Sequence, residues 1–201
     1  MKSKTNPAMG GGASASKKLM AAIAVLAVAF VVFAAIPAVD ADETGTNPTE
    51  ITDFVGFTGA LTKGGNYVLK NDINGTISGV MKVATDVSFD LNGKTIDLTG
   101  GQTITASGCT LEFKSTDKIG TLKYNGFSST TRAALSADAN GILTLDNIKF
   151  ETDGSAVYPY GNASIATIKN SDIVAGAYAV GTNNAETGTN ILSIVIENST
   201  L

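Results

Sequence analysis

The 201-residue sequence has no histidine, no tryptophan, one cysteine and one arginine. The absence of histidine removes the side chain most often used as a general base near neutral pH. The single cysteine, Cys109, excludes an intrachain disulfide bond, so the folded part depends on packing and hydrogen bonds. Cys109 stands on the apolar side of an alternating strand pattern, and we expect a buried structural thiol rather than a reactive or metal-bound one.

Positive charge is also scarce. The formal net charge is −4, and from Glu50 onward the sequence carries fifteen acidic and ten basic residues. This balance would not neutralise a phosphate backbone, so we predict no nucleic acid partner. An acidic surface likewise disfavours direct binding of an anionic polysaccharide unless a cation intervenes.

An uninterrupted apolar run lies near the N-terminus, at Leu19–Ile36, between four lysines and three carboxylates. The positive-inside rule therefore predicts that the chain after Pro37 is exported and that Leu19–Ile36 contacts the membrane. As a hydrophobic helix this run would span about 27 Å, close to a hydrocarbon core, whereas Val39-Asp40-Ala41 resembles a cleavage site. We predict that residues 1–41 are a signal peptide or an N-terminal membrane anchor, and that residues 42–49 are a linker.

Residues 50–201 are predicted to form one domain, rich in the Gly, Ser, Thr and Asn that suit short strands and turns. Its first segment, Glu50–Leu61, could form a brief helix that caps the open end of the domain. Five later segments share alternating apolar residues and a polar turn, which indicates a repeat. Aligned on the last apolar residue before the turn, they superpose Leu91, Phe113, Leu145, Ile168 and Ile196. Five positions later an apolar residue returns at Ile96, Phe150, Ile173 and Leu201, with Ile119 one place late.

These columns predict an all-β fold, a right-handed parallel β-helix of about five or six coils. Stacked coils would form apolar ladders inside and a ladder of turn asparagines, Asn147, Asn170 and Asn198, at one corner. A β-sandwich is the alternative, because dipeptides such as Asn92-Gly93 are typical of hairpins. We prefer the β-helix, because a sandwich gives no reason for the same corner to recur in register.

A resemblance to a known family supports this fold. Gly64–Ile73 (GGNYVLKNDI) and Asp86–Ile96 (DVSFDLNGKTI) are similar to the opening coils of pectin-lyase-like surface proteins, often called adhesin-like proteins in archaea and bacteria. The strings IKNSDI and IENSTL look like that family's later coils, and the resemblance covers about Glu50 to Leu201. It implies a right-handed parallel β-helix on the cell exterior, but no activity, because the fold hosts enzymes, adhesins and passive stalks alike.

Asp90 and Glu112 are the best carboxylate candidates, since both are expected to face outward on stacked coils. Neither EF-hand spacing nor a glycine-rich nonapeptide repeat is present, so we favour a solvated acidic face over a Ca²⁺ site there. We predict no catalytic residue and no cofactor. The only arginine, Arg132, lies in a loop without an acidic motif nearby.

Tyr158, Tyr160 and Tyr178 fall in corresponding inserts of neighbouring coils and suit an aromatic platform for a sugar ring. Tyrosines of this kind more often cover the outside of a core. Asn74, Asn162 and Asn198 match the glycosylation acceptor pattern and are candidate surface sites.

These observations favour a non-catalytic cell-surface module, membrane-anchored or secreted. Its role at the surface would be adhesion, display or spacing, with surface glycans or other cells as partners. The alternative is a polysaccharide lyase or glycoside hydrolase of the pectin-lyase-like fold with degenerate or missing catalytic coils; a structural wall component is a third reading. Because Leu201 falls on the inward column and no polar cap follows it, we also expect that the domain at 50–201 is incomplete at its C-terminus or that another chain covers this end.

Overall fold

The structure is a computed structural model that describes residues 47–127, 133–182 and 193–201. The predicted membrane segment Leu19–Ile36, most of the predicted linker and Arg132 lie outside these residues. In the three described ranges, no helix is long and apolar enough to cross a membrane.

All strand pairs of the described residues are parallel, and the strands form three sheets. The seven-stranded sheet has the order β1 (Thr49–Ile51), β2 (Gly65–Leu69), β5 (Val87–Asp90), β8 (Thr110–Lys114), β11 (Ile142–Asp146), β14 (Ile165–Lys169) and β16 (Ser193–Glu197). The five-stranded sheet has the order β15 (Asp172–Ala175), β12 (Ile148–Thr152), β9 (Gly120–Asn125), β6 (Thr95–Thr99) and β3 (Ile73–Thr76). The four-stranded sheet has the order β13 (Ser155–Pro159), β10 (Ala133–Asp138), β7 (Ile104–Ser107) and β4 (Met81–Val83).

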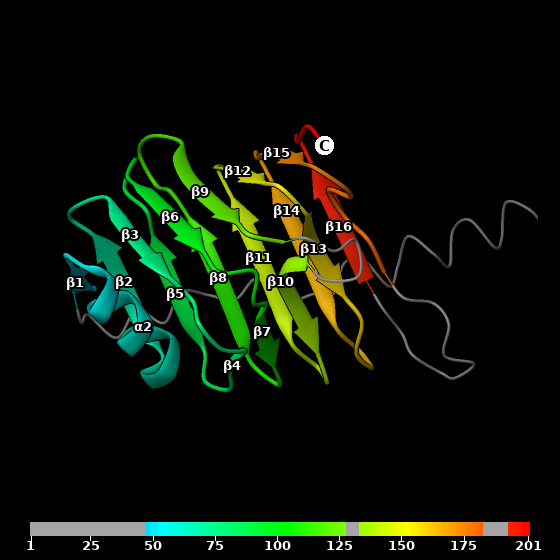
Figure 1. The fold of residues 1–201 in the computed structure, drawn as a ribbon, viewed down its shortest axis with the longest axis horizontal. Helices are drawn as coiled ribbons and strands as arrows, with labels where there is room; N and C mark the ends of the chain where they lie inside the picture. Colours follow the sequence, from blue (N-terminus) through cyan, green and yellow to red (C-terminus); the bar gives the residue numbers. More distant parts are fainter. Residues whose placement is uncertain (1–46, 128–132, 183–192) are drawn as a thin grey trace, which may run out of the picture. The chain divides into compact units, whose positions relative to one another are not determined.

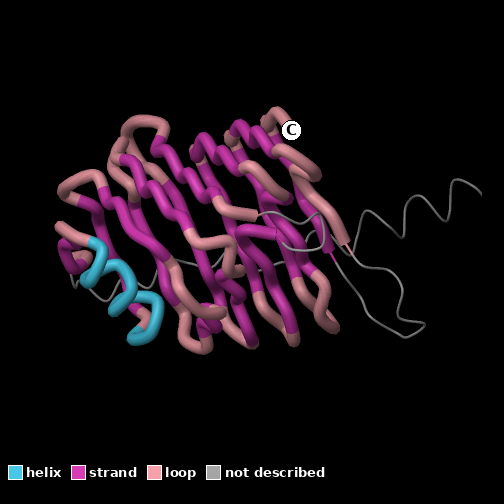
Figure 2. Tube along the Cα trace, viewed as in Figure 1, coloured by secondary structure: helices cyan, strands magenta, loops and turns pink. Residues whose placement is uncertain are grey.

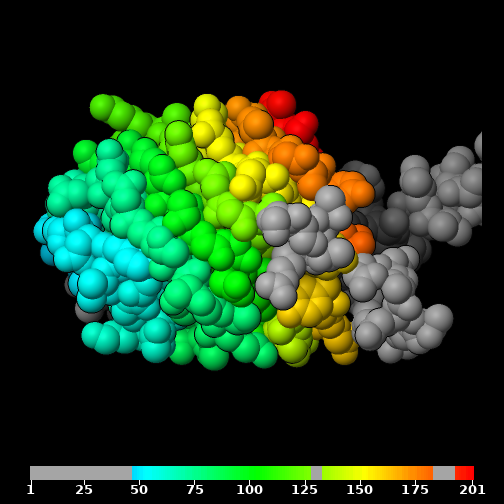
Figure 3. Space-filling view, viewed as in Figure 1, coloured from blue at the N-terminus to red at the C-terminus, as the bar shows by residue number. Residues whose placement is uncertain are grey.

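The chain visits the three sheets in turn, so that each full coil contributes one strand to each sheet. The strands β5, β6 and β7 form one coil, for example, and β8, β9 and β10 stack on it. The result is a parallel β-solenoid of about five turns, whose coils follow one another in sequence order (Figures 1 and 3). The prediction of an all-β parallel β-helix is therefore confirmed, and the sandwich, which needs antiparallel hairpins, is wrong.

A short helix, α2 (Phe54–Lys63), lies against the first coils (Figure 2). It begins at Phe54 because Asp53 caps it, with the Asp53 carboxylate accepting a hydrogen bond from the Gly56 N–H at 2.8 Å. The helix buries Phe57, whose ring centroid lies 5.0 Å from that of Phe89 inside the solenoid. The predicted short helix is thus present, although it starts later than expected, because Thr49–Ile51 pairs as a strand with β2.

Columns of apolar side chains fill the interior, with one residue from each coil. The register of the seven-stranded sheet aligns Phe113, Leu145, Ile168 and Ile196, as the repeat predicted. Cys109 lies beside this core, where it is 7% exposed and its Sγ donates to the Val83 carbonyl at 3.2 Å. Burial raises the pKa of the Cys109 thiol, and the prediction of a buried structural thiol is confirmed.

One step of the predicted alignment is wrong. Phe89, rather than Leu91, lies opposite Phe113, so the first repeat is shifted by two residues. Leu91 is also fully buried, but it sits at the corner after β5, where its N–H donates to the Lys114 carbonyl at 2.7 Å. Val87, Phe89 and Leu91 are all buried, so their alternation alone leaves the register open, and the turn after β8, residues 115–119, is longer than the turn after β5, residues 91–94.

That longer turn also displaces the next column. Leu122, rather than Ile119, lies opposite Ile96, and Ile119 is 50% exposed. Strand β9 begins at Gly120, where a Cβ atom would come within 2.6 Å of the Leu91 Cβ. Glycine at this position therefore makes room for the buried Leu91 side chain.

The four-stranded sheet was not predicted at all. Its strands lie in the stretches that the repeat alignment treated as inserts. They are rich in small residues, as in Ala133–Asp138 (AALSAD), where apolar and polar positions differ little in size. A strand of this composition gives little periodic signal.

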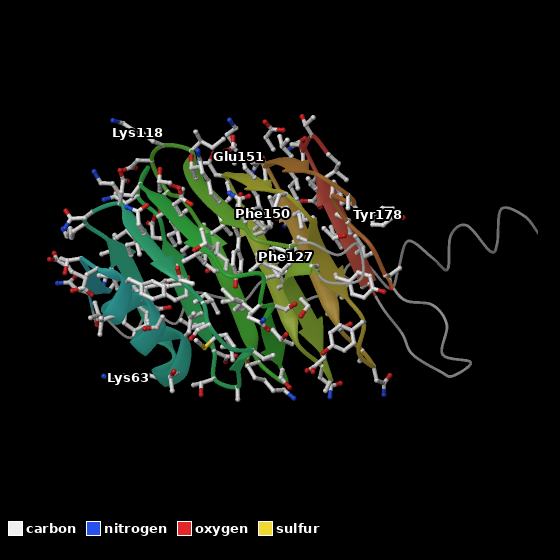
Figure 4. All side chains as sticks on the ribbon, in the orientation of Figure 1. Lys63, Lys118, Phe127, Phe150, Glu151 and Tyr178 are labelled. Atoms are coloured by element: carbon white, nitrogen blue, oxygen red, sulfur yellow. The ribbon has the colours of Figure 1, made fainter. Side chains whose placement is uncertain are left out.

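Charged side chains of alternating sign line the outer face of the seven-stranded sheet. The charge column, as we call it, consists of Asp90, Lys114, Asp146, Lys169 and Glu197, which lie opposite one another in register. A second set on the five-stranded sheet aligns Asp97, Lys123 and Glu151. Next to Glu151, Phe150 is fully buried, which shows the alternation between the two faces of a strand (Figure 4). Of these aligned charges, Lys169 and Glu197 form an ion pair at 3.3 Å, as do Lys123 and Glu151, and such cross-strand pairs favour the stacking of coils in this register.

Candidate functional site

A row of polar side chains crosses the outer face of the four-stranded sheet. The register of β4, β7, β10 and β13 aligns Lys82, Thr105, Ser136 and Tyr158. The neighbouring Ile104 belongs to the core, so the alternation along the strand places this row on the opposite face. The hydroxyl oxygens of Thr105 and Ser136 are 2.7 Å apart and share a hydrogen bond.

A cleft of about 380 Å³ lies over this row. Its described lining includes Val80, Gln102, Thr105, Ser136, Tyr158 and Tyr160. The lining combines aromatic and aliphatic surface with hydroxyl and amide groups. This combination suits a ligand that has an apolar face and hydrogen-bonding edges, as a sugar ring has.

Two of the three tyrosines proposed from the sequence lie at this cleft. The ring centroids of Tyr158 and Tyr160 are 6.3 Å apart, with the rings tilted by 35°. Tyr178 belongs to the next coil, where its carbonyl accepts a hydrogen bond from the Ala156 N–H. It is 59% exposed and lies outside the described lining of the cleft (Figure 4). The structure thus brings Tyr158 and Tyr160 together and leaves Tyr178 apart.

Asp138 holds Tyr160 in place at the cleft. The Tyr160 hydroxyl donates to Asp138 Oδ2 at 3.0 Å, and Lys82 Nζ lies 3.6 Å from the same oxygen. Asp138 Oδ1 is buried and has no hydrogen-bond partner among the described residues. Burial raises the pKa of Tyr160, and the hydrogen bond and negative charge of Asp138 raise it further. The Tyr160 hydroxyl therefore stays protonated at neutral pH and keeps its ring oriented at the cleft.

Asp90 and Glu112 lie on neighbouring strands, but they do not lie opposite each other. The register places Asp90 opposite Lys114 and Glu112 opposite Ser88. Asp90 accepts hydrogen bonds from the Thr116 Oγ1 at 2.5 Å and from two backbone N–H groups of the corner. Glu112 accepts one from Ser88 Oγ at 2.5 Å and pairs with Lys114 Nζ at 3.1 Å. Both carboxylates thus accept hydrogen bonds from the neighbouring coil.

No group of three or more Asp, Glu or Cys side chains in the described part of the chain is placed to hold a metal ion. The corner between the seven-stranded and five-stranded sheets does form a polar groove, but its described lining has no aromatic side chain. We therefore take the cleft on the four-stranded sheet as the candidate site.

The turn asparagines occupy that corner in a left-handed conformation. Asn147, Asn170 and Asn198 have φ values of 59°, 50° and 49°, which asparagine tolerates better than most residues. Asn198 Nδ2 donates to Asn170 Oδ1 at 3.5 Å, whereas Asn170 Nδ2 donates to Asp146 Oδ1 at 2.8 Å. The side chains therefore link successive coils, but only the last two asparagines bond directly to each other.

The three glycosylation candidates are all exposed. Asn74 lies on β3 beside Gly75, Asn162 lies in the turn before β14, and Asn198 lies in the turn after β16. Each therefore has an accessible side chain, although that of Asn198 is engaged with Asn170.

Sequence reasoning missed the polar partners of the two tyrosines. Gln102, Thr105, Ser136 and Asp138 lie on or beside strands of the unpredicted sheet. The sequence signal that could have found them is the short alternation in Ile104–Ser107 (ITAS), where Thr105 separates two core residues. Four residues are too few for a periodic pattern to stand out.

Comparisons with protein family models, with curated proteins and with solved structures found no match for this chain.

Proposed function

We propose that this chain is a non-catalytic cell-surface module of the pectin-lyase-like, adhesin-like type, a right-handed parallel β-helix that binds a neutral glycan in the cleft on the four-stranded sheet. The cleft itself carries this proposal. Tyr158 and Tyr160 offer aromatic surface, and Thr105, Ser136 and Gln102 offer hydrogen-bonding groups beside it. A sugar ring presents the complementary surfaces, an apolar face of C–H groups and a rim of hydroxyls.

The charge near the cleft favours a neutral ligand over an acidic one. Asp138 lies behind Tyr160, and Lys82, the nearby cation, is already paired with it. The whole chain also carries a formal net charge of −4. A polyuronate would therefore find no free cation among the described residues of the cleft to pair with.

The chemistry of the cleft supports binding rather than cleavage. Glycoside hydrolysis generally uses two carboxyl groups that flank the scissile bond, about 5 to 9.5 Å apart. Among the described residues at the cleft, Asp138 is the carboxylate present, and Asp90 and Glu112 lie on the seven-stranded sheet in structural hydrogen bonds. The apolar run Leu19–Ile36 supports display outside the cell.

The test is direct glycan binding by the full chain, kept in solution with a mild detergent. Calorimetric titration with neutral hexose oligosaccharides should show saturable binding, and oligogalacturonate should bind at least about tenfold more weakly. Tyr158→Ala and Tyr160→Ala should each weaken binding about tenfold, because each removes an aromatic contact. Tyr178→Ala is the matched control, since it removes an exposed tyrosine outside the cleft, and it should leave the affinity unchanged.

Two results would contradict the proposal. If no neutral or acidic glycan binds, the module is a passive spacer or wall component. If the wild-type chain releases reducing or unsaturated ends from a polysaccharide, and Asp138→Asn abolishes that release, the lyase or hydrolase alternative holds instead.

A further inference from the structure

The two ends of the cleft on the four-stranded sheet differ in chemistry. Tyr158 and Tyr160 line one end, on and just after β13, whereas Gln102 and Val80 line the other end, just before β7 and β4. Strand β7 is two strands away from β13 in the sheet, which is about 10 Å at the usual strand spacing. This distance exceeds the width of one sugar ring, so a glycan that fills the cleft would place different sugar units at the two ends.

Gln102 contributes a carboxamide to its end of the cleft. The main-chain carbonyl of Gln102 accepts a hydrogen bond from the hydroxyl of the buried Tyr124, so the backbone is held from inside the solenoid. Among the described residues none forms a hydrogen bond with the Gln102 carboxamide, which leaves its N–H donors and its carbonyl acceptor for a ligand. The hydroxyls of Thr105 and Ser136, in contrast, already share a hydrogen bond.

Val80 adds an exposed apolar surface next to that amide. It directly precedes Met81, whose N–H donates to the Thr103 carbonyl at 3.3 Å, so Val80 lies beside the segment of Gln102 and Thr103. Val80 is 72% exposed although it lines the cleft. A methyl group of a ligand placed on Val80 would be withdrawn from water, which favours binding.

We propose that the cleft selects glycans of N-acetylated hexosamine units over glycans of plain hexose units, with an acetamido group bound between Gln102 and Val80. This inference rests on the glycan-binding function proposed above. The acetamido N–H would donate to Gln102 Oε1, its carbonyl would accept from Gln102 Nε2, and its methyl group would cover Val80. A neighbouring sugar ring would contact Tyr158 and Tyr160. A plain hexose carries a hydroxyl at the same carbon, which supplies neither the methyl group nor the carbonyl oxygen.

The acetamido group also fits the charges at the cleft. It is uncharged, and the Lys82 ammonium is already paired with Asp138 at 3.6 Å. A deacetylated unit would carry an ammonium group and would lack both the carbonyl acceptor and the methyl group. Recognition by Gln102 and Val80 therefore predicts that removal of the acetyl groups weakens binding, whereas attraction to a chain of net charge −4 alone would strengthen it.

Two trisaccharides with the same β-1,4-linked backbone provide the test. N-acetylchitotriose carries acetamido groups, and cellotriose carries hydroxyls in their place. Calorimetric titration of the full chain, in a detergent without a sugar headgroup, should show that N-acetylchitotriose binds at least about tenfold more tightly than cellotriose. The fully deacetylated trisaccharide should bind more weakly than N-acetylchitotriose.

Two substitutions test whether Gln102 and Val80 cause the preference. Gln102→Met keeps the length of the side chain but removes the amide, and it should reduce the preference to about threefold or less. Val80→Thr exchanges a methyl group for a hydroxyl at an exposed position and should weaken the binding of N-acetylchitotriose about threefold. Val55→Thr is the matched control, since Val55 is an exposed valine of α2 outside the described lining of the cleft, and it should leave both affinities unchanged. Circular dichroism melting curves check that each variant is folded.

Equal affinities for N-acetylchitotriose and cellotriose would overturn this inference and leave the proposed glycan-binding function intact. A preference that neither Gln102→Met nor Val80→Thr reduces would also overturn it, as would tighter binding of the deacetylated trisaccharide. If none of the three trisaccharides binds, the proposed glycan-binding function is contradicted, and this inference with it.

Discussion

The ring of Phe113 stacks on that of Phe89 in the preceding coil, with centroids 5.4 Å apart and ring planes 18° from parallel. Both rings are fully buried, and Phe57 of α2 lies against Phe89 with its centroid 5.0 Å away and its ring tilted by 48°. Tyr67 of the coil before stacks on Phe89 as well, with centroids 5.8 Å apart, so aromatic rings of three successive coils form one column.

Phe113→Ala should lower the free energy of unfolding by about 3–5 kcal/mol, because it removes a buried ring and leaves a cavity between two coils. Urea unfolding of the full chain, followed by circular dichroism, measures the change. Val55→Ala serves as the control, since Val55 is 78% exposed, and its effect should stay within about 0.5 kcal/mol. If Phe113→Ala lowers the free energy of unfolding only slightly, the aromatic column does not stabilise the packing of the coils.

Asn170 provides a test of the corner geometry. Asn170→Ala should cost about 2 kcal/mol or more, because alanine is strained at a φ of 50° and the hydrogen bond to Asp146 is lost. Asn170→Gly should cost less, because glycine accepts this conformation and loses only the side-chain hydrogen bonds with Asp146 and Asn198. If the free energy of unfolding falls equally in both variants, the left-handed backbone conformation at position 170 does not affect stability.

Lys169→Glu tests the charge column. It would place an acidic side chain between Asp146 and Glu197 and should destabilise the fold by about 1 kcal/mol at low ionic strength. In 1 M NaCl, where the screening length is about 3 Å, most of that loss should disappear. Lys169→Gln is the matched control, with a smaller loss that depends less on salt. A loss for Lys169→Glu that is equal at both salt concentrations would exclude an electrostatic cause.

Because of the buried Tyr124 side chain, the free energy of unfolding should fall at alkaline pH. Its side chain is fully buried and its hydroxyl donates to the Gln102 carbonyl; burial raises its pKa to about 12. The unfolded chain releases this proton near pH 10, so the stability from the protonated phenol is complete below pH 10 and is lost as the pH rises toward 12. The loss should reach about 2–3 kcal/mol.

The comparison variant for that prediction is Tyr124→Phe, which has no phenol to ionise. Its free energy of unfolding should be lower at neutral pH, because the hydrogen bond is missing. Between pH 10 and pH 12 it should fall less steeply than that of the wild type. Parallel pH profiles for the two proteins would show that Tyr124 does not titrate differently in the folded state.

The sequence was most informative where the strands alternate strongly. Phe113, Leu145, Ile168 and Ile196 were aligned correctly, because long apolar residues separated by polar ones specify both the face and the register of a strand. The first step of the alignment was shifted, because Val87, Phe89 and Leu91 are all buried and only the turn lengths decide which of them pairs with Phe113.

For a related reason, only part of the candidate site could be predicted from the sequence. Tyr158 and Tyr160 stand out in the sequence as neighbouring aromatic residues. Thr105 and Ser136 do not, because they come together only through the register of two short strands that are far apart in the chain. Small side chains such as those of Ala134 and Ala137 give that register no visible signature in sequence, although they are fully buried in the structure.

The alternating charge column has a consequence for how such a protein can evolve. Removal of a single coil, for example the one that carries Lys114, would bring Asp90 against Asp146, and duplication of that coil would bring two lysines together. Gain or loss of two neighbouring coils would keep each charge of the column opposite one of the other sign. Changes in length by gene duplication should therefore be tolerated best in steps of two coils. The alternating surface charges thus favour adding or removing an even number of repeats.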